Sequence, residues 1–363
     1  MYFENVRDTY HASLLHLFFA TFRITRLSSG GGVLVSATGE HHASATLAPP
    51  QGKDPTYEGL RSDDESFRLA DPRLLGMHDE FHDDIQLQIL SIFPGFILQQ
   101  VHNALAIRQI VPRGVDATDL HWTYLGFVDD TADLRAHRLR QNNLVGPAAM
   151  CRWRTAASAA SCSAASRRGG RVVGGGDGRR GRRDAGDACD RGLGARLLES
   201  LPHAHGAVMS GAETLFRLAA LNSDYASCLD ADRLEAWPDL FLESCLYRIT
   251  SADNQRRGYA AGLVYADSRA MLVDRVAALR QANIYERQAY RHIIGMPALR
   301  PGEDITAETP FLVVRAMRDG RMDLFAAGVY LDRVREAGGG LRFAERIVVC
   351  DSSRIDTLLA IPL

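Results

Sequence analysis

Residues 151–208 cannot form a packed core, and this stretch constrains the fold of the chain more than any other feature. Arg, Gly and Ala dominate it, as in Arg167-Arg168-Gly169-Gly170-Arg171, and apolar side chains are scarce. A segment that buries little apolar surface cannot offset the entropy lost on ordering. We therefore expect a disordered segment between two globular parts, residues 1–150 and 209–363.

The first part, residues 1–150, is predicted to be an antiparallel sheet with a few helices. Residues 33–35, 85–89 and 121–127 have the composition of strands, and the last two alternate with period two. The run 96–107 is longer and apolar, and it contains a His-Asn pair. This pattern favours an α+β layer.

The second part, residues 209–363, begins with a helical pattern over 215–234. Strand-like runs follow at 241–250, 311–316, 324–330 and 347–350. Asp319-Gly320 and Gly338-Gly339-Gly340 are typical of hairpin turns. Helices followed by antiparallel strands predict a curved sheet that cups the helices.

A candidate metal motif lies near the start of the chain, where Asp8, His11 and His16 follow Asn5 with the spacing Asp-x2-His-x4-His. Two imidazoles and one carboxylate, with open positions, suit Fe(II) and O2 chemistry. The two histidines stand roughly 140° apart on an ideal helix, so both reach one metal only through a widened turn. The alternative is an ordinary amphipathic helix, because apolar side chains recur over 14–22.

This segment, with Glu4-Asn5 before it, resembles the mononuclear-iron motif of Rieske-type aromatic-ring-hydroxylating dioxygenase large (α) subunits. Residues 108–112 and 142–148 also resemble that domain. The resemblance implies an incomplete helix-grip-type sheet domain in which His11 and His16 bind iron. It further implies that Asp8 carries electrons from a neighbouring subunit's Rieske cluster and that Asn5 lies near the site.

Residues 209–363 resemble the complete small (β) subunit of the same dioxygenases, which implies a nuclear-transport-factor-2-like cone. The similarity is carried by 230–238, 266–269, 282–287 and 358–363. Both parts are similar in sequence to enzymes acting on aromatic carboxylates, such as salicylate 5-hydroxylase and anthranilate dioxygenase. The resemblance thus implies a component of an aromatic-ring-hydroxylating oxygenase of aromatic catabolism.

The resemblance also implies the cofactors and partners. Intact members of the family use Fe(II) with O2 and take electrons from NAD(P)H through ferredoxin or reductase and a Rieske 2Fe-2S cluster. No C-x-H pattern pairs with C-x-x-H in this sequence, so the cluster and NAD(P)H would come only through partner components. Expected partners are intact α subunits and other β subunits in an α3β3-type oligomer.

The third iron ligand, a carboxylate in the family, is apparently missing. Residues 151–156 can be encoded by bases that, read two positions later, give Ser-Met-Glu-Asp-Gly, the kind of acidic peptide that the family carries after Gly-Pro-Ala. Lys53 is the only lysine, as a GC-rich gene would produce, and out-of-frame GC-rich DNA yields Arg, Gly and Ala. We infer a frameshift near Met150 and expect this chain alone to be inactive.

Two other functions stay open: a purely structural β subunit that assembles with intact α subunits, and an unrelated cone-fold enzyme or binding module. In the cone, structural hydrogen bonding is the expected role of the polar groups Asp224, Tyr225, Tyr247 and His292.

The remaining histidines carry less specific signals. His78 and His82 have a zinc-capable spacing but lack the H-E-x-x-H pattern and fall in a charged, loop-like region. The pair His41-His42 is expected to be solvated. For His102 and His121, in apolar runs, we expect a core or pocket position.

Composition excludes several classes. The formal net charge is −2, so neither nucleic acid nor an anionic membrane is an expected partner. No apolar run reaches the roughly 18–20 residues that span a bilayer. Six scattered cysteines without C-x-x-C indicate a reducing, cytoplasmic protein.

Resequencing the DNA across codons 140–215 tests the frameshift directly. We expect a missing or extra base, because one slip explains both the Arg-rich stretch and the absent carboxylate. A continuous reading frame with matching message would contradict this inference.

Overall fold

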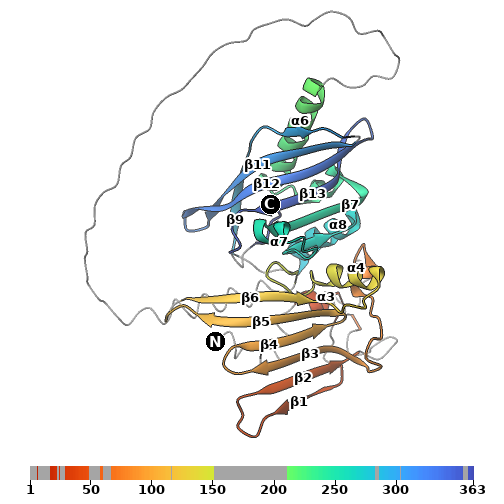
Figure 1. Cartoon of the computed structure of the whole chain (residues 1–363), viewed down its shortest axis with the longest axis vertical. Helices are drawn as coiled ribbons and strands as arrows, with labels where there is room; N and C mark the ends of the chain where they lie inside the picture. Colours follow the sequence, from red (N-terminus) through yellow and green to blue (C-terminus); the bar gives the residue numbers. More distant parts are fainter. Residues whose placement is uncertain are drawn as a thin grey trace, which may run out of the picture.

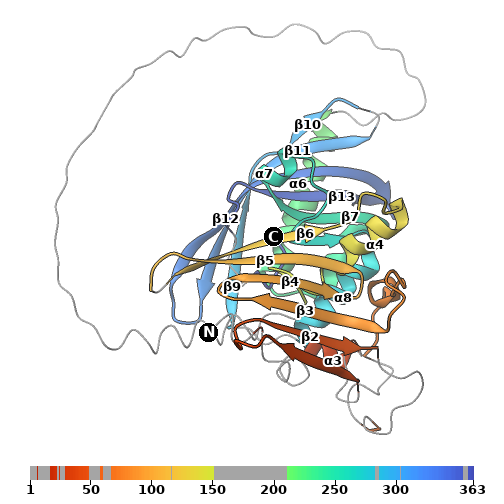
Figure 2. The same cartoon turned by 60° about the horizontal axis from the view of Figure 1, so that its bottom comes forward.

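The structure, a computed structural model, describes residues 6, 17–22, 24, 29–48, 58–59, 67–115, 117–150, 211–282, 286–302, 304–354 and 359–363. The described residues form two antiparallel-rich sheets, each with its own helices, that lie side by side (Figures 1 and 2). The predicted intervening segment, 151–208, lies outside the described residues. Within the described residues, no helix combines the length and apolar character needed to cross a bilayer.

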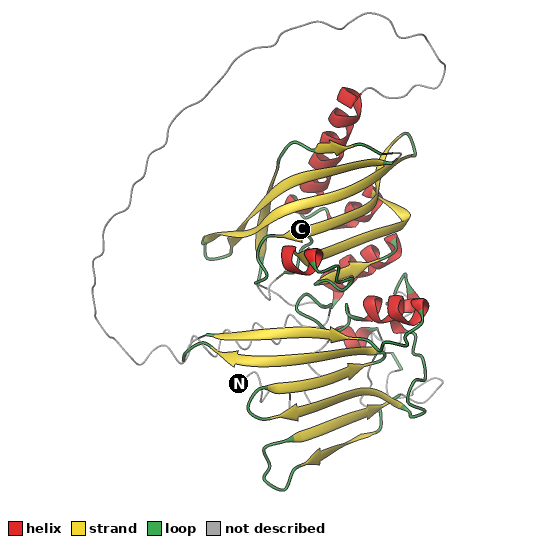
Figure 3. Ribbon diagram, in the orientation of Figure 1, coloured by secondary structure: helices red, strands yellow, loops and turns green. Residues whose placement is uncertain are grey.

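In the part of the chain that the structure describes, the first sheet has six strands in sequential order, and every neighbouring pair is antiparallel (Figure 3). Its strands are β1 (Gly31–Val35), β2 (His42–Leu47), β3 (Ile85–Ile92), β4 (Phe96–Val101), β5 (Ala104–Pro112) and β6 (Thr118–Leu125). The strands predicted at 33–35, 85–89 and 121–127 are confirmed by β1, β3 and β6.

The apolar run 96–107 is two strands, not one, because a two-residue turn at His102-Asn103 divides it. His102 has a φ of 51°, in the left-handed region, which His adopts more readily than most residues. Val101 and Ala104 pair across the turn, as a tight hairpin requires. In β4 the buried side chains Ile97, Gln99 and Val101 alternate with more exposed ones, so period two holds here.

Among the described residues, the helical segments beside the first sheet are α3 (Leu17–Thr21), a 3-10 helix (Pro72–Leu75) and α4 (Ala132–Gln141). Thr131 caps α4, since its hydroxyl accepts the backbone N–H of Leu134. Asp71 caps the 3-10 helix by accepting the N–H of Arg73, with a proline at the first position. Figure 1 shows α4 beside one end of the first sheet, close to α8 (Arg269–Gln281) of the second part.

The second sheet has seven strands in the order β10-β11-β12-β13-β7-β8, and β9 pairs with β11. Its strands are β7 (Phe241–Ser251), β8 (Val264–Ala266), β9 (Gln288–Ile294), β10 (Ala298–Arg300), β11 (Ile305–Met317), β12 (Met322–Ala337) and β13 (Gly340–Cys350). Its helices are α6 (Gly211–Asp230), a 3-10 helix (Leu234–Leu240), α7 (Ala252–Arg256) and α8 (Arg269–Gln281).

The turns that build this sheet are those that the sequence predicted. Gly320 has a φ of 85° between β11 and β12, and Gly338 and Gly339 have φ values of 60° and 78° between β12 and β13. Glycine adopts this left-handed region without a steric cost. The long strands β11 to β13 curve around α6, which confirms the predicted α+β cone (Figure 1).

Aromatic rings fill the interior of the cone. Tyr225 on α6 meets Trp237, Phe241 and Phe343 edge to face with centroid distances of 5.9 to 6.4 Å. Such edge contacts add about 0.5–1.5 kcal/mol each to the burial of the rings. Phe311 stacks on the ring of Tyr330. These aromatic side chains form a closely packed centre.

An ion pair lies inside this aromatic core. Arg346 on β13 donates from Nε to Asp332 on β12 over 2.8 Å, and both side chains are almost fully buried. The guanidinium also lies over the rings of Tyr225, Tyr330 and Phe343, at 3.9 to 4.2 Å. Burial acts to lower the pKa of Arg346, but the charge and hydrogen bonds of Asp332 outweigh it and raise the pKa.

Replacing only one member of this pair should destabilise the fold strongly. Asp332→Leu leaves an uncompensated buried cation, which typically costs about 3–5 kcal/mol. The double variant Asp332→Leu/Arg346→Met should recover most of that loss, because two apolar groups of similar volume replace the pair. Urea unfolding of the three proteins checks this, and equal stability of the single and double variants would contradict it.

Candidate functional site

The four residues predicted for the metal site, Asn5, Asp8, His11 and His16, lie outside the described residues. Their roles therefore stay predictions. The structure describes a residue within the motif's sequence, Val6, which is buried against Ile97 of β4.

The face of the first sheet that carries Ile97 is an inner face with both polar and apolar side chains. The pairing registers bring together His42 and Ser91, then Ser91 and Ile97, then Ile97 and Arg108. All four of these side chains are buried. Gln99 lies on the same face and is buried too. Val6 packs on this face, which therefore carries a basic side chain and hydrogen-bonding groups beside apolar ones.

Arg108 is the basic group of the inner face. It projects inward from β5 in register with Trp122 of β6, and its guanidinium lies 5.1 Å from the centroid of that indole ring. A guanidinium beside an aromatic face is a suitable partner for a planar carboxylate. The alternation Ala104, Ala106, Arg108 along β5 is the sequence signal that could have revealed this inward charge.

A second buried polar cluster holds the end of the sheet. Arg138 of α4 donates to Asp130 over 2.8 Å, to the carbonyl of Asn103 over 2.5 Å, and to Glu80. Burial alone would lower the pKa of Arg138, yet the hydrogen bonds to Asp130 and Glu80 outweigh burial and raise it. Through the hydrogen bond from Arg138 to Asn103, the cluster connects α4 to the β4-β5 turn.

The other candidate histidines do not form a metal site among the described residues, which hold no group of three or more His, Cys, Asp or Glu side chains suited to a metal ion. His78 meets His137 edge to face at 4.7 Å, while His82 is exposed and lies 3.4 Å from Asp79. Burial lowers the pKa of His137.

Two of the histidine predictions are wrong and one holds. His42 is buried on the inner face and is not solvated, because β2 turns this position inward. His121 is exposed, because β6 is the edge strand of the sheet and this position faces outward. His102 is buried as expected, with its Nε2 2.7 Å from Gln86, and burial lowers its pKa to about 4.

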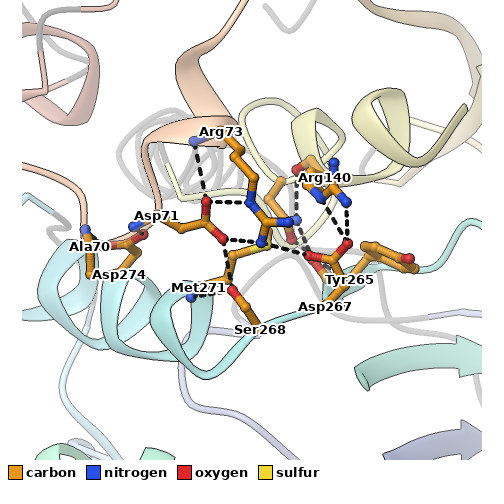
Figure 4. A network of polar contacts seen from close by, with 10 residues as sticks. Ala70, Asp71, Arg73, Arg140, Tyr265, Asp267, Ser268, Met271 and Asp274 are labelled. Atoms are coloured by element: carbon orange, nitrogen blue, oxygen red, sulfur yellow. Dashed lines mark hydrogen bonds and ion pairs between the residues drawn. The ribbon is translucent and has the colours of Figure 1, made fainter. Parts of the chain in front are cut away.

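The two parts of the chain meet at a network of polar contacts (Figure 4). The carboxylate of Asp274, on α8, accepts the backbone N–H groups of Ala70 and Asp71 over 2.5 and 2.9 Å. Ser268, the N-cap of α8, donates from its hydroxyl to Asp71 over 2.7 Å. Arg73 binds Asp71 through two nitrogens, and its hydrogen bonds lower the pKa of Asp71 to about 2.

Three further contacts extend this junction. Arg140 of α4 donates to Asp267 over 2.7 Å. Asn143 pairs with the backbone of Tyr265 in β8, accepting its N–H over 3.3 Å and donating to its carbonyl. Arg275 donates to the carbonyl of Ala148 over 3.2 Å. On the side of the cone, the junction is therefore formed by β8 and the first turns of α8.

In the cone, three of the four polar groups singled out from the sequence pair with protein partners. The hydroxyls of Tyr225 and Tyr247 donate to a main-chain oxygen of Leu363 over 2.5 and 3.0 Å. His292 lies with Nδ1 2.6 Å from Asp230, which also accepts its backbone N–H. Asp224 is exposed on α6. The partners Asp230 and Leu363 could not be identified from local sequence, since they are far from the groups that they bind.

Both parts of the chain resemble subunits of one kind of enzyme. A family model described as "Ring hydroxylating beta subunit" matches residues 225–357. The terephthalate 1,2-dioxygenase terminal oxygenase subunit beta 1 from Comamonas is 50% identical over 40% of this chain and 97% of that subunit. The chain therefore belongs to the ring-hydroxylating β-subunit family.

The first part is similar to large subunits. Subunit alpha 2 of terephthalate 1,2-dioxygenase from Comamonas is 53% identical over 41% of this chain and 36% of that subunit. The anthranilate 1,2-dioxygenase large subunit from Burkholderia cepacia is 41% identical over 41% of this chain and 36% of that subunit. The chain thus spans about a third of these large subunits and nearly all of a small one. The predicted resemblance of both parts is confirmed, and the likeness to anthranilate and salicylate enzymes is found at lower identity than that to terephthalate enzymes.

The buried carboxyl of Asp274 should make stability depend on pH. Burial raises its pKa to about 6 from 3.8, although the N–H groups of Asp71 and Ala70 act against the rise. A raised carboxyl pKa contributes stability that is present below pH 4 and is lost as the pH rises through about 6. The loss is about 2 kcal/mol between pH 4 and 7 for a shift of this size.

The matched variant Asp274→Asn cannot ionise, so this part of the pH dependence should disappear. Denaturant unfolding at pH values from 4 to 7 measures the difference in unfolding free energy between the two proteins. If the unfolding free energies of the wild type and the variant change with pH in parallel, Asp274 does not titrate in this range.

Proposed function

We propose that this chain derives from the terminal oxygenase of an aromatic-ring-hydroxylating system and acts as one of its components, with a truncated large-subunit catalytic part and a small-subunit cone. One observation carries the proposal: the two parts match the large and the small subunit of the same enzyme, terephthalate 1,2-dioxygenase, at 53% and 50% identity. An unrelated cone-fold enzyme would not require the first match.

An aromatic carboxylate is the proposed substrate class. The names of the relatives refer to terephthalate and anthranilate, which are aromatic acids. Buried Arg108 beside Trp122 supports the same class, because one group suits a carboxylate and the other an aromatic ring. Gln99 and Ser91, buried on the same face, add hydrogen-bonding groups.

Fe(II) is the metal proposed for His11 and His16, with Asp8 as the route for electrons and Asn5 beside the site. The donor set is incomplete, however, because the usual mononuclear site has two histidines and one carboxylate. The sequence after Ala149 is rich in Arg rather than acidic. We therefore propose that the chain alone does not turn over.

Catalysis would then depend on partners. We propose assembly with intact α subunits and other β subunits in an α3β3-type oligomer, with the Rieske cluster and NAD(P)H electrons reaching it through those components. The cytoplasm is the proposed compartment. Cys228, Cys245 and Cys350 are free thiols buried in the cone, which agrees with a reducing environment.

The metal proposal predicts substoichiometric iron. The purified chain should hold well under one iron per molecule, because two imidazoles without a third ligand bind Fe(II) weakly. His11→Ala/His16→Ala should lower the iron content further, whereas the control His41→Ala, at a histidine outside the motif, should leave it unchanged. Elemental analysis measures this, and one tightly held iron per chain would refute the incomplete site.

A further inference from the structure

The junction of Figure 4 joins two parts that the relatives carry on separate subunits. Its cone side is compact: Asp267, Ser268 and Asp274, with Arg275 beside them, all belong to the start of α8 and the residues before it. Its other side consists of the loop that contains Ala70 to Arg73 and the end of α4 with the residues after it. A contact between such parts has the character of a subunit interface formed within one chain.

The contacts at this junction are specific rather than incidental. Asp274 and Arg275 are charged, yet both are buried where the parts meet. The guanidinium of Arg275 is shielded from water, and this burial lowers its pKa to about 10. A buried charge is tolerated only where partner groups satisfy it. Here the partners are the backbone N–H groups of Ala70 and Asp71 and the carbonyl of Ala148.

Backbone groups supply much of the first part's side of the contact. A large subunit that presents the same loop could offer the same N–H and carbonyl groups whatever its side chains. Arg140 and Asn143 add a positive charge opposite Asp267 and an amide opposite the edge of β8. The surface at β8 and α8 thus fits the catalytic part of a large subunit.

We propose that residues 67–76 and 140–148 cover, within the same chain, the surface of the cone through which it would bind an intact large subunit. The proposal rests on the proposed function, because it names the partner of the same oxygenase component. The chain is then self-capped: its own truncated large-subunit part competes with intact large subunits for one surface.

The covalent connection favours the internal contact. Joining two binding modules turns their association into an intramolecular event, with effective concentrations that reach the millimolar range. An intact large subunit at micromolar concentration must compete with the internal contact at this higher effective concentration. Weakening the junction from the side of the first part should therefore expose the cone surface without altering it.

Three variants separate the two sides of the junction. Arg140→Glu/Asn143→Ala opens it from the first part and leaves the cone surface intact. Asp267→Arg/Asp274→Ala opens it from the cone and damages the proposed binding surface. Arg300→Ala, which removes a cone ion pair with Glu308, is the control.

Two measurements on the full-length chains test the proposal. Amide hydrogen exchange at Ala70 and Asp71 reports opening of the junction, and exchange along β11 and β12 reports that the cone stays folded. Binding to subunit alpha 2 of the Comamonas terephthalate 1,2-dioxygenase reports access to the surface. Even unfolding of the first part would leave the binding measurement valid, since the cone carries the surface.

We expect faster exchange at Ala70 and Asp71 in both junction variants. Only Arg140→Glu/Asn143→Ala should gain affinity for the large subunit, by about tenfold or more over the wild type, because it alone frees an undamaged surface. The control should behave as the wild type in both measurements.

The inference is overturned if the wild type binds as tightly as Arg140→Glu/Asn143→Ala, since the surface would then not be capped. It is equally overturned if the cone-side variant gains the same affinity, since the partner would use another surface, or if exchange does not change. If exchange rises but no chain binds the large subunit, the proposed assembly itself fails, and this outcome is distinct from the others.

Discussion

The carboxylate of Asp274 is the contact on which the arrangement of the two parts depends. By accepting the N–H groups of Ala70 and Asp71, it fixes the start of the loop that leads into the 3-10 helix. Beyond that helix, the carbonyl of Gly76 accepts a hydrogen bond from Gln141 of α4 over 2.6 Å. Gln141 in turn accepts the N–H of Asn103 in the β4-β5 turn over 2.8 Å. A run of buried hydrogen bonds therefore connects the cone to the end of the first sheet.

The described interior of the cone is a packed core whose named charged groups have protein partners. Its centre is filled by aromatic rings, and its ionisable groups pair with one another, as Arg346 does with Asp332 and His292 with Asp230. A catalytic acid or base needs access to substrate, whereas these side chains are buried in packed surroundings.

The parts of the fold that local sequence controls were predictable. Glycine turns at 319–320 and 338–340 define the long hairpins, and the strand at 85–89 was found from its alternation. The division of 96–107 was not predicted, because an apolar run conceals a turn whose positive φ is adopted by His102 rather than by glycine. The pairing of Asp274 with Ala70 was beyond local sequence, since the two lie 204 residues apart. The candidate metal ligands came from a spacing pattern and a resemblance, and the described residues leave them as predictions.

The junction also bears on why so short a piece of a large subunit is folded at all. The first part corresponds to about a third of its large-subunit relatives, and β1 has Val33, Leu34 and Val35 exposed. Yet Leu74 and Leu144 are completely buried, in a hydrophobic cluster that continues into the cone. Apolar burial drives folding roughly in proportion to area, so a fragment that shares its core with a neighbour gains stability that it lacks alone. The cone is therefore both the partner of the first part and a source of the core that keeps it folded, which is why opening the junction should affect the first part more than the cone.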